Sequence, residues 1–183
     1  MQKDGIDLSE EFLYWGCKKI DGRLDDNGTT LNSAINSLKS YGQPKEEYWT
    51  YDSCCLITNN TYQPSEDAKV EALKKRIYNG NRLAISVEEV KQKLSDRYAV
   101  IIGIVLFEEF LIPSSGLVPL PQNVNKALGG HAVLIAGWDD RLWNGVFIIR
   151  NSWGESWGVN GYGFIPYQYF LNYTVDAWAY KNN

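Results

Sequence analysis

Two residues late in the chain have the chemistry of a catalytic pair. His131 is the only histidine and lies in GGHAVLIAGWDD, whereas Asn151 lies in FIIRNSWGESWGVNGYGF. A neutral imidazole can take a proton from a nucleophile at one ring nitrogen while the other nitrogen donates to a fixed acceptor. An amide oxygen is such an acceptor and adds no charge. The pair therefore predicts a general base, His131, oriented by Asn151.

The residues beside this pair fit the same chemistry. Gly129 and Gly130 add little bulk before His131, so another chain could approach it closely. The indole of Trp153 could cover the hydrogen bond between the pair and keep water from competing for it. A plainer interpretation stays open, in which the histidine is structural and NSWG is a turn with a core tryptophan.

Helices are predicted for the first half of the sequence. Apolar residues at helical spacing follow capping signals in residues 7–20, 29–42, 65–80 and 86–98. Asp7 with Glu10 has the spacing of a capping box, as does Ser86 with Glu89, and Ser65 is the expected N-cap of the third helix.

The second half predicts strands instead. Four apolar stretches rich in β-branched residues cover residues 99–107, 131–138, 145–151 and 161–166. Asn144–Gly145 is a turn signal between two of them, so a hairpin brings His131 near Asn151. Residues 111–130 form a long connection. The pattern predicts an α+β protein with an antiparallel sheet, divided into a helical part, residues 1–75, and a β-rich part, residues 76–183.

Composition narrows the classes of function. With 44% hydrophobic and 14% aromatic residues among 183, the chain can bury a substantial core. The net charge is −4 and no run of Lys or Arg is present, so we expect no nucleic acid partner. The longest apolar run is too short to cross a bilayer, and the N-terminal residues lack the apolar core of a signal peptide. The compartment stays open, with the cytoplasm slightly favoured.

Three cysteines, Cys17, Cys54 and Cys55, cannot all pair within the chain. There is no C-x-x-C spacing, and one histidine cannot complete a Cys/His cluster. We therefore expect no metal site and no cofactor.

The His131 and Asn151 motifs resemble those of papain-like cysteine peptidases. The stretch GGHAV, the GW that follows it, and RNSWGESWGVNGYG match in residue type and order. DLSEEFLYW and GTTLNSAINSLKSYGQPKEEYWTYD are similar to upstream segments, particularly of bacterial members, and DAWAY to the closing strand. The resemblance implies a two-lobed fold, with a helical left lobe, a β-rich right lobe and a peptide or protein substrate in the cleft between them.

The resemblance also implies roles for individual residues. His131 would be the general base, Asn151 its orienting partner and Trp153 a supporting residue. Gly28 and Thr29 are similar to a glycine-containing stretch that lines the substrate cleft, and Gly130 and Ala132 flank the base; the alternative for the first two is a helix-entry turn.

In this family the nucleophilic cysteine precedes the base by about 130–150 residues. Counting back from His131 reaches the start of the sequence, so we expect the nucleophile, its central helix and the oxyanion-hole glutamine to lie outside it. The family counterpart of Cys17 is a disulfide cysteine. Cys54 and Cys55 are weak substitute nucleophiles, because no electropositive group is visible near them.

Three interpretations remain open. The chain is part of a complete thiol peptidase, with an N-terminal segment or a partner chain completing the left lobe. Alternatively, it is an inactive pseudopeptidase that binds peptides or proteins, or another nucleophile serves a different acyl transfer. Loss of the central helix would expose apolar surface, so we expect this chain to need a further segment, a partner or a rearrangement for stability.

Overall fold

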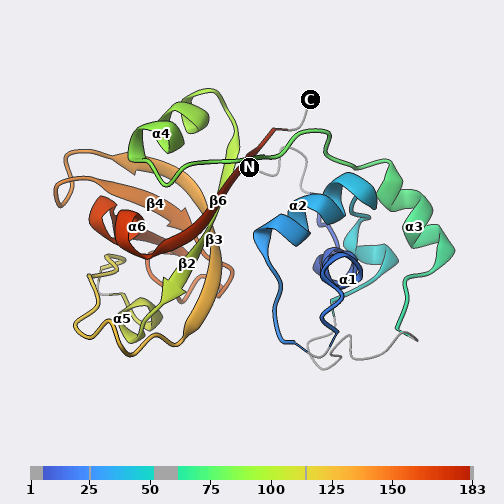
Figure 1. Cartoon of the computed structure of the whole chain (residues 1–183), viewed down its shortest axis with the longest axis horizontal. Coiled ribbons are helices and arrows are strands. Elements are labelled where there is room, and N and C mark those ends of the chain that lie inside the picture. Colours follow the sequence, from blue (N-terminus) through green and yellow to red (C-terminus); the bar gives the residue numbers. More distant parts are fainter. Residues whose placement is uncertain (1–5, 25, 52–61, 114, 182–183) are drawn as a thin grey trace. The chain divides into compact units, whose positions relative to one another are not determined.

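A computed structural model of the chain describes residues 6–24, 26–51, 62–113 and 115–181. The chain forms two compact units, and the division falls between Asn79 and Gly80, shortly after the position expected from the sequence. Figure 1 labels some of the helices and strands of each unit.

The first unit is helical. It contains α1 (Glu10–Asp21), α2 (Leu31–Ser40), the 3-10 turn η1 (Glu46–Tyr48) and α3 (Glu66–Leu73). The predicted cap of α1 at Asp7 is wrong, because Ser9 is the N-cap and its hydroxyl accepts from the Phe12 N–H. Asp7 is held in an extended segment by its carbonyl, which accepts from the N–H of Glu46 at 3.0 Å, so the helix begins after it.

The third helix is shorter than predicted. Ser65 is its N-cap, as expected, but the helix ends at Leu73 rather than near residue 79. The N–H of Lys75 donates to a carbonyl only three residues back, which tightens the last turn, and the N–H of Ile77 donates to Leu38 in α2 at 3.3 Å. Contact with α2 therefore replaces the last helical turns that the sequence pattern favours.

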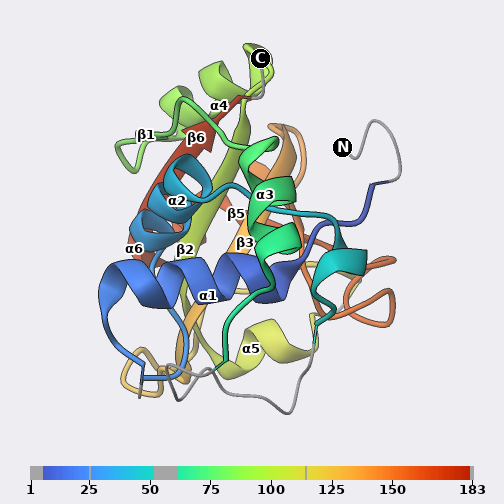
Figure 2. The ribbon, with the colours of Figure 1, turned by 90° about the vertical axis from the view of Figure 1, so that its right-hand side faces the viewer.

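Aromatic residues form the core of the first unit. Phe12 and Trp15 of α1 are buried and pack against Ala68 and Ala72 of α3. Figure 2 shows α1 lying across α2 and α3. Gly42 has a φ of +75°, and a Cβ there would lie 2.0 Å from the Ala72 carbonyl oxygen, so this close approach requires glycine.

The second unit is built on a six-stranded antiparallel sheet in the order β1-β6-β2-β3-β4-β5. This confirms the predicted α+β class and antiparallel pairing. The elements, in chain order, are β1 (Asn81–Arg82), α4 (Val87–Ser95), β2 (Ala99–Leu106), α5 (Glu108–Leu111), β3 (Gly129–Asp139), β4 (Val146–Arg150), β5 (Tyr162–Pro166), α6 (Tyr167–Tyr173) and β6 (Thr174–Tyr180).

One buried cluster joins this sheet to its helices. Alternate residues of β2 (Val100, Ile102 and Ile104) are fully buried, and α4 and α6 contribute Val90 and Phe170 to the same cluster. The alternation explains why the strands could be predicted from the sequence. Within the described ranges, no helix is both long and apolar enough to cross a membrane.

Candidate active site

The β3–β4 hairpin brings His131 and Asn151 together. Its register pairs Leu134 with Arg150, so Asn151 leaves the sheet diagonally opposite His131. His131 is paired with Ile104 in β2 and shares the core-facing side of β3 with the buried Val133. The hairpin that the turn signal predicts therefore places both side chains on one face.

A short hydrogen bond joins the two side chains. The Nε2 atom of His131 lies 2.8 Å from Oδ1 of Asn151. The same oxygen accepts from the backbone N–H of Ser152, also at 2.8 Å. Because a backbone N–H can only donate, the atom facing it must be the amide oxygen, and this fixes the orientation of the Asn151 side chain.

This orientation determines the proton positions on His131. An oxygen that faces Nε2 can only accept, so Nε2 carries a proton. In the neutral ring, Nδ1 then has a free lone pair. His131 is half-buried and only 4% of Asn151 is exposed, so water competes little for the hydrogen bond between the two side chains. The arrangement can take a proton at Nδ1 and hold the resulting imidazolium in place.

Three aromatic rings support the imidazole. Trp153 lies against it with ring centroids 4.7 Å apart, and the Phe110 ring is steeply inclined to it, with the two centroids 5.6 Å apart. Phe110 is fully buried and stacks on Trp157. Trp153 is 39% exposed, so it covers the imidazole from the solvent side. The rings limit the rotation of His131 and exclude water from one side of it.

Glycines shape the loop that presents Asn151. The Asn151 N–H donates to the Gly161 carbonyl at 3.0 Å, which ties the two ends of the loop together. Gly158 has a φ of +60°, and a Cβ at this position would lie 2.2 Å from the Tyr162 carbonyl oxygen. The second WG pair of the motif is therefore a packing requirement of the loop that carries the orienting residue.

The other predicted site residues lie in different places. Gly130 and Ala132 flank His131 on β3 and are exposed. Gly28 and Thr29 lie in the loop between α1 and α2 of the first unit. Cys54 and Cys55 lie outside the described residues.

Cys17 has the properties of an inert thiol. Its side chain is buried, and this burial raises the pKa of the thiol to about 11, against a smaller opposing effect of a hydrogen bond with Thr29. At neutral pH the group is protonated and a poor nucleophile. Among the described residues, no group of three or more His, Cys, Asp or Glu side chains could hold a metal ion.

Three contributors to the site could not be found by sequence reasoning. Phe110 lies on a helix of four residues, which leaves no helical periodicity to detect. Trp157 is part of the quoted motif, but its contact with Phe110 depends on the tertiary fold. The Ser152 N–H is a backbone group, so its donation to Asn151 leaves no trace in residue type.

Comparison with known proteins gives consistent matches. The family model described as papain family cysteine protease matches residues 1–175. An uncharacterized peptidase C1-like protein of Acanthamoeba polyphaga mimivirus is 31% identical over 180 residues, which cover 93% of this chain and 57% of that protein. Cysteine proteinase 1 of Entamoeba histolytica is 29% identical over 162 residues, covering 86% of this chain and 47% of that protein.

A solved structure of a cysteine protease is also similar to this chain. Xylellain, a cysteine protease from Xylella fastidiosa, superposes with a TM-score of 0.84 and 27% sequence identity, covering 96% of this chain and 70% of that one. The chain spans about half the length of the two relatives above.

Proposed function

Because the chain belongs to the papain family of cysteine proteases, we propose that it carries the general-base half of a thiol peptidase site. His131 is the base, Asn151 holds it, and Trp153 shields their hydrogen bond. The observation that supports this most strongly is the shared acceptor: Oδ1 of Asn151 binds both Nε2 of His131 and the Ser152 N–H, each at 2.8 Å. This leaves Nδ1 as the basic atom.

The proposed reaction is amide hydrolysis through an acyl-enzyme. Nδ1 of His131 takes the proton of a cysteine thiol, and the thiolate attacks the peptide carbonyl carbon. The C–N bond then breaks, and the imidazolium returns its proton to the leaving amine. In the second half, His131 deprotonates a water molecule that attacks the thioester, and the cysteine is released as a thiol. The position of Nδ1 opposite the Asn151 bond suits it to both transfers.

The nucleophile of this reaction is proposed to come from outside the present sequence, on a further segment or a partner chain that completes the helical lobe. The substrate is a peptide or protein. Gly28 and Thr29 on one unit, and Gly130 and Ala132 beside the base, are proposed to contact it. All four are exposed, as substrate contacts must be.

One observation favours a second candidate function. Cys17, the free cysteine within the described ranges, is buried and has a raised pKa, so this part of the chain offers no reactive thiol. Without a nucleophile from a further segment or partner, this protein would be a pseudopeptidase that binds peptides without cleaving them. Against this, a binding module has no chemical need for an oriented imidazole.

Thiol trapping separates the candidates. We would treat the chain with an epoxysuccinyl peptide, which alkylates activated cysteines, and measure the mass gain of the wild type and of H131A. No gain in either is expected if the nucleophile comes from elsewhere, and fluorogenic peptides should then be cleaved only when a longer coding region or a partner is supplied. Labelling at Cys54 or Cys55 that H131A abolishes would show that the chain has its own nucleophile.

The outcomes for binding are equally distinct. Peptide binding without cleavage, both in the chain and in every longer form, would establish the pseudopeptidase. Cleavage by a longer form that H131A removes would establish the peptidase. A fully active H131A variant would overturn the proposed role of His131.

A further inference from the structure

The loop between α1 and α2 encloses a buried cation. Lys18 of α1 is only 2% exposed, whereas residues 26–30 of the loop around it are exposed. The Lys18 Nζ donates to the carbonyl oxygens of Arg23 at 2.8 Å and Asp26 at 2.7 Å. The ammonium also lies 5.4 Å from the centroid of the Tyr14 ring. The buried ammonium of Lys18 therefore binds the backbone of the exposed loop that follows α1.

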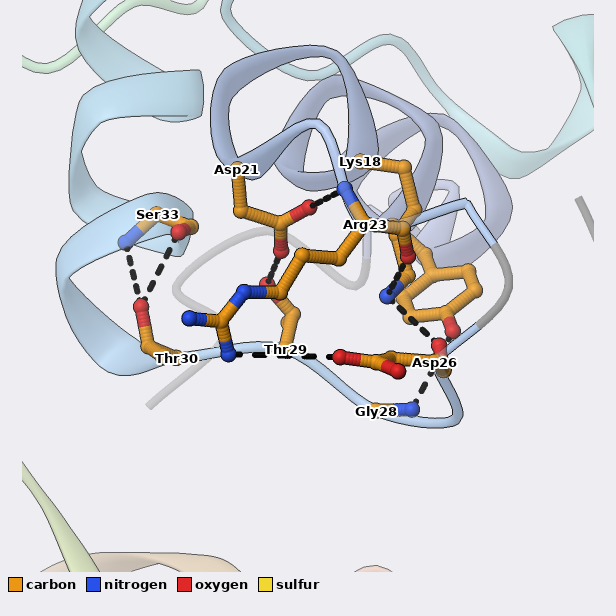
Figure 3. Close-up of polar contacts among 9 residues, drawn as sticks. Lys18, Asp21, Arg23, Asp26, Gly28, Thr29, Thr30 and Ser33 are labelled. Carbon is orange, nitrogen blue, oxygen red and sulfur yellow. Dashed lines mark hydrogen bonds and ion pairs between the residues drawn. The ribbon is translucent and has the colours of Figure 1, made fainter.

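Two more side chains of α1 hold the same loop. The Asp21 carboxylate accepts from the Arg23 N–H and from the Thr29 hydroxyl, both at 2.9 Å. The Tyr14 hydroxyl accepts from the Gly28 N–H at 3.2 Å. Tyr14, Lys18 and Asp21 are spaced four and three residues apart, so they share one face of the helix. Figure 3 shows the contacts of Lys18 and Asp21 with the loop.

The burial of Lys18 has an energetic cost that the loop must offset. A buried ammonium is unfavourable unless its protons find acceptors, and among the described residues the acceptors are the backbone carbonyls of Arg23 and Asp26. Both carbonyls belong to the loop, so the loop conformation and the buried charge depend on each other. Replacing Lys18 by methionine would leave the two carbonyls without this donor. The apolar methionine side chain could still fill the space that the lysine stem occupies.

We propose that Lys18 is a positioning residue that sets the backbone of the α1–α2 loop, so that Gly28 and Thr29 are presented to a peptide in one conformation. This proposal rests on the proposed function, which places these two residues in contact with the substrate. The loop is then preorganised from within its own unit, and binding need not spend free energy on ordering it. Lys18 itself does not touch the peptide.

The matched pair K18M and K19M tests this. Lys19 is the next residue of α1 and is exposed, so K19M changes the charge equally without touching the loop. We expect hydrogen exchange at the Gly28 amide to accelerate at least about tenfold in K18M. We expect K19M to match the wild type. Affinity for one labelled octapeptide, chosen as the tightest wild-type binder on a peptide array, should fall about tenfold in K18M at conditions where the chain stays folded.

Y14F provides a second, milder variant. It removes only the acceptor of the Gly28 N–H, so exchange should accelerate at Gly28 while exchange in the core of α1 stays unchanged. If K18M lowered only the melting temperature, with wild-type exchange at Gly28 and wild-type peptide affinity, the positioning role would be overturned.

The two proposals fail differently. A wild-type chain that bound no peptide on the array would overturn the peptide-contact role of the loop and the pseudopeptidase function together. Faster Gly28 exchange in K18M would still support anchoring by Lys18, and unchanged exchange would refute it.

Discussion

Trp157 holds both the ring and the backbone of Phe110. The two ring centroids are 5.0 Å apart at an interplanar angle of 28°, and the indole Nε1 donates to the Phe110 carbonyl oxygen at 2.9 Å. Phe110 in turn contacts His131 and Trp153. The rigid part of the site thus extends beyond the motif residues to the four-residue helix α5.

The variant W157F should lower the free energy of unfolding. Phenylalanine can keep the stacking, but the buried Phe110 carbonyl loses its donor, which costs about 1–3 kcal/mol. Urea unfolding measures the change. W178F is the control, because its indole N–H donates to the half-buried Asp176, where water can replace it. Equal loss in both variants would contradict a special role for the Phe110 bond.

The variant N151A should change the tautomer of His131. With the amide oxygen gone, Nε2–H loses its acceptor and the neutral ring can populate the Nδ1–H form. Nitrogen chemical shifts report the tautomer, and the single histidine makes the signals unambiguous. S152A keeps the backbone N–H and should leave the tautomer unchanged. An Nε2–H ring in N151A identical to the wild type would show that Asn151 does not set it.

Asp139 should titrate well below an ordinary aspartate. Arg141 donates to its two carboxylate oxygens at 3.1 and 2.9 Å, and these bonds lower the pKa of Asp139 from 3.8 to about 2. Because the folded pKa is the lower one, the stabilisation is fully present above about pH 4 and is lost as the pH falls toward 2.

Carbon NMR of the Asp139 carboxyl checks this titration. R141M should raise the midpoint toward 3.8 and weaken the pH dependence of the melting temperature in this window. R82M removes a different exposed ion pair, with Asp176, and should leave the Asp139 midpoint in place. An unchanged Asp139 midpoint in R141M would refute the assigned cause.

Cys17 should resist alkylation in the folded chain. Its pKa is raised from 9.0 to about 11, so at pH 8 the thiolate is about a hundredfold scarcer than in the unfolded chain. Iodoacetamide labelling of a C54S/C55S variant, followed by mass spectrometry with and without urea, measures the ratio. The native rate should rise about tenfold per pH unit toward pH 11. Native labelling as fast as in urea would show that Cys17 is accessible and ionisable.

The sequence predicted the strands and the His131–Asn151 contact because both depend on local patterns. Alternating burial in β2 and the turn at Asn144–Gly145 leave clear signals. The helices α5 and α6 leave none, since they have only four and seven residues and are specified by burial of Phe110 and Phe170 against the sheet. Tertiary packing decides such short segments.

The finer details of the site depend on groups without a sequence signature. Residue types indicate that Asn151 can orient His131, but not which of its amide atoms faces the imidazole. That choice follows from the Ser152 N–H, whose position is known only once the loop is folded. Likewise, the sequence predicts an exposed lysine on the surface of a helix at position 18. Its burial follows only from the folded loop that covers it.

The position of β6 has a consequence for how the second unit is made. This strand, residues 174–180, is the last of the described strands yet lies between β1 and β2 inside the sheet. During synthesis, β2 therefore lacks one of its two neighbours until β6 has left the ribosome. His131 is made about fifty residues before β6 is finished, but the sheet that carries it is complete only once that strand has paired. The sheet that carries His131 is thus completed by the strand that is made last among its six.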